Sequence, residues 1–295
     1  MKPAPFSYRR PVTLAEATEI YAANPDAKVL AGGQSLIPLL SMRLAAPTML
    51  IDINGIEELD RLDVDSGQVR FGATVRHARL LADGDVLRAQ PLLGKALAYV
   101  AHPTIRNRGT TLGSIVHADA SAEMPVVLAL LGGTVTAVSA GGTRTLSAED
   151  LFIGPLETSL RSGEIATAAT VPTLAANTGV GFTETARRHG DYALCGVASM
   201  VATDDNGAVT SARAGYLSVC DTPTVVDVSE VFMDGSFTER AARDAAELAL
   251  GSLDPETDIH ASADYRRQLA RVLTVRALHE AHEDCVARRA GALKP

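Results

Sequence analysis

The amino-acid sequence predicts an α+β fold in which helices and strands alternate in the first part of the chain. Over residues 1–90, helical segments that begin at capping residues alternate with short apolar strands. Beyond a run of small residues near 174–178, strand-like segments follow one another with tight turns between them, as in an antiparallel meander. These strands span 181–188, 193–203 and 209–219, and two helices over 238–250 and 265–290 complete the chain.

The first unit has the order strand, glycine loop, helix, strand, after an opening helix. Thr13 and Glu16 have the spacing of a capping box, which starts a helix that continues to Tyr21. The elements expected after it are a strand over 28–30, a glycine loop over 31–35, a helix over 36–44 and a strand over 49–53. Pro47 stops the second helix, because proline cannot continue a helical hydrogen-bond ladder.

A second unit contains one long segment without periodicity. Residues 102–119 are rich in Gly, Thr and Ser and poor in apolar side chains, so we expect an ordered but irregular loop there. Around it we expect strands over 68–75, 135–138 and 165–171 and helices over 77–81, 91–100 and 124–131. The predicted domains are an α/β lobe over 1–57, a second α/β lobe over 58–176 and an antiparallel sheet with helices over 177–295.

Composition excludes several classes of protein. The chain of 295 residues has 27 Lys and Arg against 35 Asp and Glu, a formal charge of −8, and no basic run, so we expect no nucleic-acid binding. Cys195, Cys220 and Cys285 lie far apart and form no CxxC pair. The chain therefore cannot supply four thiolates to an iron–sulfur cluster or a zinc ion, and the odd cysteine count predicts a reducing cytoplasm rather than a disulfide framework.

No membrane span is expected. The amino terminus lacks the apolar core of a signal peptide. The uncharged stretch Met124–Thr143 contains Pro125 and two glycine pairs, so a helix followed by a strand explains it better than a single bilayer helix.

The Gly32-Gly33-Gln34-Ser35 loop is the first candidate for chemistry. Glycines between a strand and a helix let backbone N–H groups converge on an anion, and the positive end of the helix dipole favours a phosphate or pyrophosphate there. A tight turn with Ser35 as helix N-cap explains the same residues. Neither a Walker loop nor the GxGxxG dinucleotide fingerprint is present.

The segment 104–123 is the second candidate. Thr110, Thr111 and Ser114 offer hydroxyls, and Gly113 allows the backbone to approach a ligand closely. Asp119 is placed to accept hydrogen bonds from ribose or other hydroxyls. Two glycine-rich loops on one domain could hold the two ends of a long anionic cofactor.

Three motifs together resemble one known family. The chain reads AGGQSLIPLLSMR, then IRNRGTTLGSIVHADASAEMP about seventy residues on, then RRHGDYALCGVA. In this order and spacing, over essentially the whole chain, they resemble the FAD-binding medium subunit of the molybdenum hydroxylases, of the carbon monoxide dehydrogenase and xanthine dehydrogenase type. The resemblance implies a two-lobed FAD-binding domain, of the PCMH or vanillyl-alcohol-oxidase-like type, with an antiparallel sheet-and-helix domain after it.

The resemblance also implies which residues bind FAD and how. Backbone amides of the first loop would hold the pyrophosphate, the second loop would contact phosphate and flavin, and Asp119 would bind along the ribityl and ribose portion. Tyr192 would stand against the flavin ring, where a tyrosine can limit access of electron acceptors. The implied cofactor-binding residues are Ala31, Gly32, Gly33, Gln34, Ser35, Leu36, Ile105, Thr110, Thr111, Gly113, Ser114, His117, Asp119, Glu123 and Tyr192.

The chain departs from the family pattern at two places. Members commonly read Gly-Gly-Asn where this chain has Gly113-Ser114, and serine has a shorter reach than asparagine. Many members carry a lysine shortly before the Arg187-Arg188 pair, where this chain has Thr183 and Glu184. The lysine that the resemblance implies for stabilising a reduced, anionic flavin is therefore missing from this strand. Arg187 and Arg188 remain, but paired arginines are more often surface or interface residues than flavin contacts.

Within the family, the medium subunit does not oxidise the substrate. A large subunit carries a molybdopterin cofactor, a small subunit carries two [2Fe-2S] clusters, and electrons pass through the clusters to FAD and on to a terminal acceptor. The implied assembly is a heterotrimer, doubled by symmetry. The substrate of the complex stays open among carbon monoxide, aldehydes, purines, nicotine-like N-heterocycles and aromatic acids, and so does the acceptor.

Other interpretations are weaker. A self-sufficient flavin oxidase would need a catalytic base near the ring, and none stands out. A structural subunit that has lost FAD disagrees with the intact glycine loops. A metal site at His279, His282 and Cys285 lacks the HExxH spacing and a fourth ligand, so a solvated helix face explains these residues better.

Overall fold

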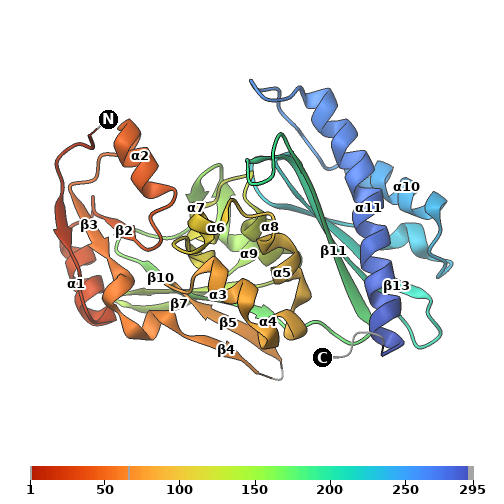
Figure 1. Ribbon diagram of the computed structural model, residues 1–295, viewed down its shortest axis with the longest axis horizontal. Coiled ribbons are helices and arrows are strands. Elements are labelled where there is room, and N and C mark those ends of the chain that lie inside the picture. The colour runs from red at the N-terminus through yellow and green to blue at the C-terminus, as the bar shows by residue number, and fades with distance from the viewer. Residues whose placement is uncertain (1, 66, 292–295) are drawn as a thin grey trace.

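A computed structural model describes residues 2–65 and 67–291, and it confirms the α+β class. Figure 1 shows three bodies side by side along the long axis. The N-terminal lobe lies at one end, a central lobe follows, and the C-terminal sheet with its two helices lies at the other end. Over the described residues, no helix is both long and apolar enough to cross a membrane.

The N-terminal lobe is built on a small parallel sheet with the strand order β1-β3-β2. Its strands and helices are β1 (Ser7–Arg9), α1 (Leu14–Ala23), β2 (Lys28–Leu30), α2 (Leu36–Met42) and β3 (Met49–Asp52). The hydroxyl of Thr13 caps α1 by accepting the N–H of Glu16, as the capping-box spacing predicts. Helix α2 ends at Met42, earlier than expected, because Arg43 adopts a left-handed conformation.

The central lobe contains an antiparallel sheet in the order β4-β5-β10-β6-β7 and a layer of short helices. Its strands are β4 (Leu62–Val64), β5 (Gln68–Gly72), β6 (Thr134–Ser139), β7 (Gly142–Ser147), the small pair β8 (Phe152–Gly154) and β9 (Glu157–Thr158), and β10 (Ile165–Pro172). Its helices are α3 (His77–Ala82), α4 (Gly84–Ala89), α5 (Pro91–Leu97), α6 (Pro103–Arg106), α7 (Thr111–His117), α8 (Glu123–Leu130) and α9 (Ala148–Leu151).

The expectation of an irregular segment over 102–119 is wrong, because α6 and α7 occupy most of it. Thr110 is the N-cap of α7, where its Oγ1 accepts the N–H of Gly113 at 3.1 Å. Leu112 and Ile115 anchor α7 in the core, each only 1% exposed. The Gly and Thr residues that resemble a loop in composition therefore serve as a helix cap and its first turn.

The C-terminal sheet has the simple antiparallel order β11-β12-β13-β14, as the meander predicts. Its elements are β11 (Thr178–Ala186), β12 (Ala193–Thr203), β13 (Val209–Leu217), β14 (Thr224–Asp227), α10 (Glu239–Leu250) and α11 (Ala263–Arg289). Asp204 accepts the N–H groups of Asn206 and Ala208 in the β12–β13 turn, where Gly207 has φ +89°.

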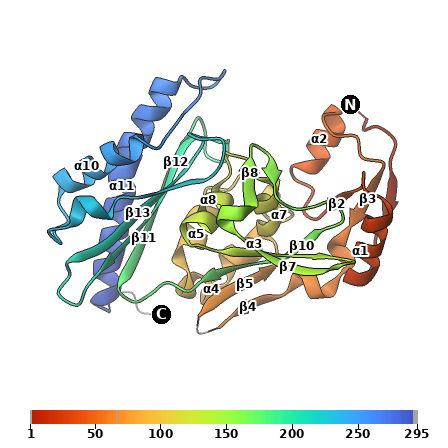
Figure 2. The same cartoon turned by 180° about the vertical axis from the view of Figure 1, so that it is seen from behind.

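The C-terminal sheet is covered on both faces. Helix α11 packs along β11 and β12 on the outer face, and α5 and α8 contact the inner face, as Figures 1 and 2 show from opposite sides. Accordingly β12 is almost continuously buried rather than alternating. Val180 and Phe182 belong to the core shared with the central lobe, whereas Val197 and Val201 belong to a second core under α10 and α11.

Two glycines allow α11 to lie directly on β11. A Cβ on Gly181 would stand 2.3 Å from the carbonyl oxygen of Ala277, and one on Gly179 would stand 2.1 Å from that of Ala281. Any side chain at these positions would therefore push the helix off the sheet.

We expect Gly181→Ala to lower the free energy of unfolding by about 1–3 kcal/mol, the cost of overpacking a close contact. Gly141→Ala is the matched control, since its added Cβ would meet only the Ser139 hydroxyl, at 3.7 Å. Urea denaturation of both variants measures the difference. Equal stability of the two variants would contradict this account of the packing.

Candidate cofactor-binding site

Five successive backbone N–H groups, from Gly32 to Leu36, form the centre of the site. Within the described part of the chain, none of them donates a hydrogen bond to the protein. Gly33 has φ +72°, a left-handed conformation, and Ser35 lies in the right-handed helical region. The loop thus presents unpartnered amides just before a helix start, an arrangement that suits an anion.

The Ser35 side chain is not used as a helix cap. It is the N-cap residue of α2 by position, but its hydroxyl makes no capping hydrogen bond. Gln34 is held by its own loop, since its Nε2 donates to the carbonyl oxygen of Gly32 at 3.0 Å. The explanation of these residues as a tight turn capped by Ser35 therefore lacks the capping hydrogen bond that it requires. The serine hydroxyl stays available to a ligand.

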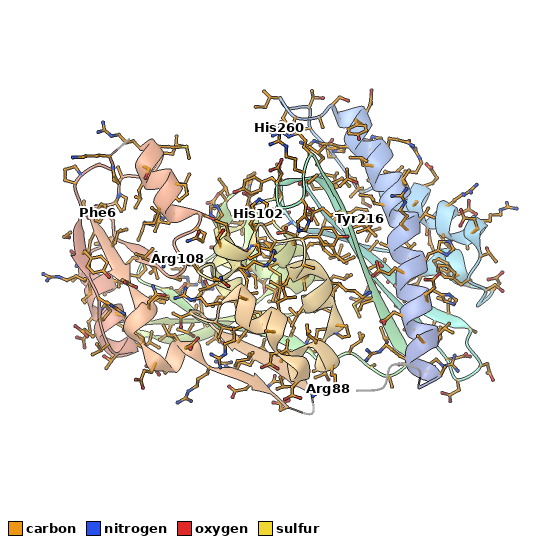
Figure 3. All side chains as sticks on the ribbon, viewed as in Figure 1. Phe6, Arg88, His102, Arg108, Tyr216 and His260 are labelled. Atoms are coloured by element: carbon orange, nitrogen blue, oxygen red, sulfur yellow. The ribbon has the colours of Figure 1, made fainter. Side chains whose placement is uncertain are left out.

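The two glycine-rich segments meet at their backbones. A Cβ on Gly32 would lie 2.6 Å from the carbonyl oxygen of Arg108 and 2.9 Å from the amide nitrogen of Thr110. Figure 3 shows Arg108 where the N-terminal lobe faces the central helices. Only glycine permits this approach, so the first loop and the start of α7 form one continuous surface across the two lobes.

Asn54 and Arg76 hold the two lobes together beneath this surface, and sequence reasoning missed both. Asn54 donates from Nδ2 to the carbonyl oxygen of Ala31 at 2.8 Å and to Asp52 at 2.6 Å. Arg76 donates to Asn54 Oδ1 and to the carbonyl oxygen of Arg108, each at 2.6 Å. In the sequence, Asn54 is recognisable only as part of an Asn-Gly turn signal. Arg76 belongs to no local motif that would indicate its role.

Thr111 faces the core instead of the cleft. It is 0% exposed, and its hydroxyl lies 3.0 Å from Nδ1 of His77. His77 also donates its backbone N–H to the carbonyl oxygen of Gly109 at 3.0 Å. Burial, together with the charge of Arg106, lowers the pKa of His77 to about 4, so the imidazole stays neutral. The Thr111 side chain therefore positions the loop and does not reach a ligand in this conformation.

The remaining predicted residues of α6 and α7 are distributed around the loop. Thr110 is 3% exposed and caps α7, while Ile105, whose carbonyl oxygen accepts the N–H of Gly109 at 2.7 Å, is half-buried. Gly113 and Ser114 lie in the first turn of α7 and are half-buried. The Ser114 hydroxyl has no partner among the described residues, so it can bind a ligand.

A group of acidic residues follows α7. His117 ends the helix, and Asp119 accepts the N–H of Ser121 at 2.9 Å with one carboxylate oxygen, which leaves the other free. Glu123 begins α8 and is 8% exposed. Burial and the charge of Asp119 raise the pKa of Glu123 to about 7, against the N–H of its own backbone.

Tyr192 stands above these acids on the turn between β11 and β12. Its side chain is 69% exposed, and desolvation and the carboxylates of Asp119 and Glu123 raise the pKa of its hydroxyl. The turn rests on the central lobe at Gly190, where a Cβ would lie 2.7 Å from the imidazole of His102. An exposed aromatic ring on an anchored turn can cover a flat ligand.

The histidines of α11 do not form a metal site. His279 bonds to Glu239 at 2.7 Å, His282 stacks on Phe237 with ring centroids 4.2 Å apart, and Cys285 is buried against Asn177. Over residues 2–65 and 67–291, no group of three or more His, Cys, Asp or Glu side chains could hold a metal ion.

Comparisons with known proteins identify the family of the chain. Residues 4–174 match the family described as the FAD binding domain in molybdopterin dehydrogenase, and residues 181–281 match the CO dehydrogenase flavoprotein C-terminal domain. The nicotine 6-hydroxylase medium subunit of Paenarthrobacter nicotinovorans is 38% identical, over 95% of this chain and 99% of that subunit. The carbon monoxide dehydrogenase medium chain of Hydrogenophaga pseudoflava is 32% identical, over 97% and 100%.

A solved structure extends the likeness to the whole fold. A chain of quinoline 2-oxidoreductase from Pseudomonas putida 86 superposes with a TM-score of 0.91, 39% identity and coverage of 97% of this chain and 99% of that one. Fold and site thus define an FAD-binding chain of an oxidoreductase. It belongs to the FAD-binding medium subunits of the molybdenum hydroxylase family.

We expect Gly32→Ala to weaken FAD binding roughly 10- to 100-fold. The added Cβ would push the two loops apart, and overpacking of this kind costs about 1–3 kcal/mol. Gly84→Ala is the matched control, since its added Cβ would meet only the flexible end of Arg88, at 3.3 Å. Fluorescence titration with FAD measures both affinities. Unchanged affinity in the Gly32 variant would contradict the two-loop surface.

The buried His77 also predicts a dependence of stability on pH. The unfolded chain binds a proton below about pH 6.5, whereas folded His77 accepts one only near pH 4, so stability falls as the pH drops between these values. The loss from this group is about 3 kcal/mol. His77→Gln cannot titrate, so its stability difference from the natural chain should shrink toward pH 4 in denaturant unfolding. Parallel pH profiles of the two proteins would contradict this.

Proposed function

We propose that this chain holds FAD between its two loops, receives electrons from [2Fe-2S] clusters of a partner subunit and passes them to a terminal acceptor. The observation that carries the proposal is the row of five unpartnered N–H groups from Gly32 to Leu36, which lies directly against the start of α7. A diphosphate has the charge and the acceptor oxygens that such a row requires.

The roles proposed for the residues follow from their placement. The amides of Gly32–Leu36 and the Ser35 hydroxyl hold the pyrophosphate, and Gly113 and Ser114 extend the surface on the second lobe. Asp119 and Glu123 lie toward the ribityl and ribose hydroxyls, and Tyr192 covers the flavin ring. Thr111 acts through His77 as a positioning residue.

FAD supplies chemistry that suits an intermediate carrier, because it exchanges single electrons with clusters and electron pairs with an acceptor. The chain's own residues bind and orient the cofactor. Its cysteines do not suit clusters, since Cys195 and Cys285 are buried and each thiol is remote from the loops in sequence. We therefore assign the clusters to a small subunit and the molybdopterin cofactor to a large subunit, in a heterotrimer doubled by symmetry.

The medium chain does not select the substrate in this proposal. Chains with one fold and 32–39% identity to this one belong to enzymes named for nicotine, carbon monoxide and quinoline. Enzymes for such different substrates share one kind of FAD-binding chain. We therefore assign recognition of the substrate to the molybdenum subunit.

The cofactor assignment is tested by the visible spectrum of the full chain after incubation with FAD. We expect a flavin spectrum, about one flavin per chain, and FAD rather than FMN in the supernatant after denaturation. If the isolated chain stays colourless, the measurement is repeated on the chain co-expressed with its partner subunits. A colourless complex would overturn the assignment and favour a structural subunit.

The electron path is tested in the complex. We expect substrate to reduce both clusters and flavin in the complete complex, but only the clusters after FAD is removed. Turnover with the terminal acceptor should then stop and return when FAD is added back. Oxidation of an organic substrate by the isolated FAD-loaded chain would instead favour a self-sufficient oxidase.

A further inference from the structure

Glu184 faces the candidate site from the inner face of the C-terminal sheet. Along β11, Gly179, Gly181 and Thr183 pack on α11, where the Thr183 hydroxyl donates to the carbonyl oxygen of Leu273 at 3.3 Å. Since side chains alternate along a strand, Phe182 and Glu184 point to the opposite face. Phe182 confirms this, because its ring lies 5.3 Å from that of Tyr99 in the central lobe.

One oxygen of the Glu184 carboxyl is buried without a partner. Glu184 as a whole is half-buried, but its Oε2 is inaccessible to solvent and makes no hydrogen bond among the described residues. Glu123, 8% exposed at the start of α8, accepts a hydrogen bond from its own backbone N–H and none from another described residue. Burial, and then the charge of Glu123, raises the pKa of Glu184 to about 8.

The groups around the two carboxyls do not offset their charge. Burial, and then the charges of Glu280 and Glu184, raise the pKa of Tyr99, whose ring packs on Phe182 on the same face of the sheet as Glu184. Glu123 is coupled in the same way to Asp119 and to Tyr192. Among the described residues neither carboxyl forms an ion pair, and no cation contributes to the raised pKa of either group.

We propose that Glu184, coupled to Glu123, is a proton-binding site linked to the reduction of FAD. This rests on the proposed function, since it requires FAD beside Asp119, Glu123 and Tyr192. A side chain with a permanent positive charge would respond to reduction only through that charge, whereas this carboxyl binds a proton when negative charge arrives nearby.

Reduction by the clusters of a partner subunit would add two electrons and one proton to bound FAD, and so one negative charge, beside this carboxyl. The new negative charge raises the proton affinity of Glu184, whose carboxylate then takes one proton from water and forms an O–H bond. Each reduction above the pKa of Glu184 therefore consumes two electrons and two protons, one on the flavin and one on the carboxyl. By linkage, a protonated Glu184 makes FAD easier to reduce.

The test is the midpoint potential of FAD bound to the full chain, measured by anaerobic dye equilibration from about pH 7 to about pH 9.5. One proton per two electrons gives a slope of about 30 mV per pH unit, and a second proton doubles it. We expect the natural chain to steepen from about 30 to about 60 mV per pH unit near pH 8. Glu184→Gln should keep the shallow slope throughout.

Two further variants complete the design. Glu123→Gln removes the charge beside Glu184, so the change of slope should move to lower pH. Glu256→Gln alters an exposed glutamate remote in sequence from the site and should leave the profile of the natural chain unchanged. Infrared difference spectra on reduction at pH 8.5 or so should show a protonated carboxyl band that appears in the natural chain and is missing in Glu184→Gln.

Failure of this inference can be told from failure of the proposed function. If the chain binds FAD and Glu184→Gln has the same slopes and infrared bands as the natural chain, the proton-binding role is overturned and FAD binding stands. If neither the chain nor its complex binds FAD, the proposed function falls and this inference falls with it.

Discussion

The close contact between Gly32 and the backbone at 108–110 is the constraint on which the site depends. It joins two lobes with separate sheets, and it leaves the amides of residues 32–36 facing outward without protein acceptors. Asn54 and Arg76 support it with four hydrogen bonds that link Ala31, Asp52 and Arg108. The neutral His77 fixes the position of α7 through its hydrogen bond with the Thr111 hydroxyl at the start of that helix. Backbone geometry, not charged side chains, prepares this surface for an anion.

The C-terminal sheet has a second, different role. Its outer face is closed by α11 through two glycines, whereas its inner face contributes Phe182, Glu184 and the Tyr192 turn toward the central lobe. Strand β12 is buried on both sides where the sheet packs between α11 and the central helices. Groups that act on the flavin ring can therefore come from a domain that is not part of the nucleotide-binding lobes.

Sequence reasoning predicted the fold class, most long elements and the glycine loop, because these depend on local patterns such as capping boxes and strand alternation. It missed α4 and the strands β1, β4, β7, β8, β9 and β14, most of them short. It also took α6 and α7 for irregular chain; for α7 the reason is that the burial of Leu112 and Ile115 is a tertiary effect. Arg76 and the orientation of Thr111 were invisible for the same reason, because their partners lie 22 to 34 residues away in the sequence. Glu184 stood out only through its departure from the family pattern.

The small size of the N-terminal sheet has a consequence for how the protein matures. The sheet has three short parallel strands, one of them exposed along its whole length, and most of the lobe's buried apolar residues belong to the core that it shares with the central lobe. So small a sheet contributes little stability on its own. A ligand that bridges both lobes would therefore stabilise their docking as well as fill the site. A substitution that destabilises the N-terminal lobe, even far from the loops, would then reduce cofactor binding in an otherwise folded chain. Cofactor binding would in turn favour the docked lobes before the subunits assemble.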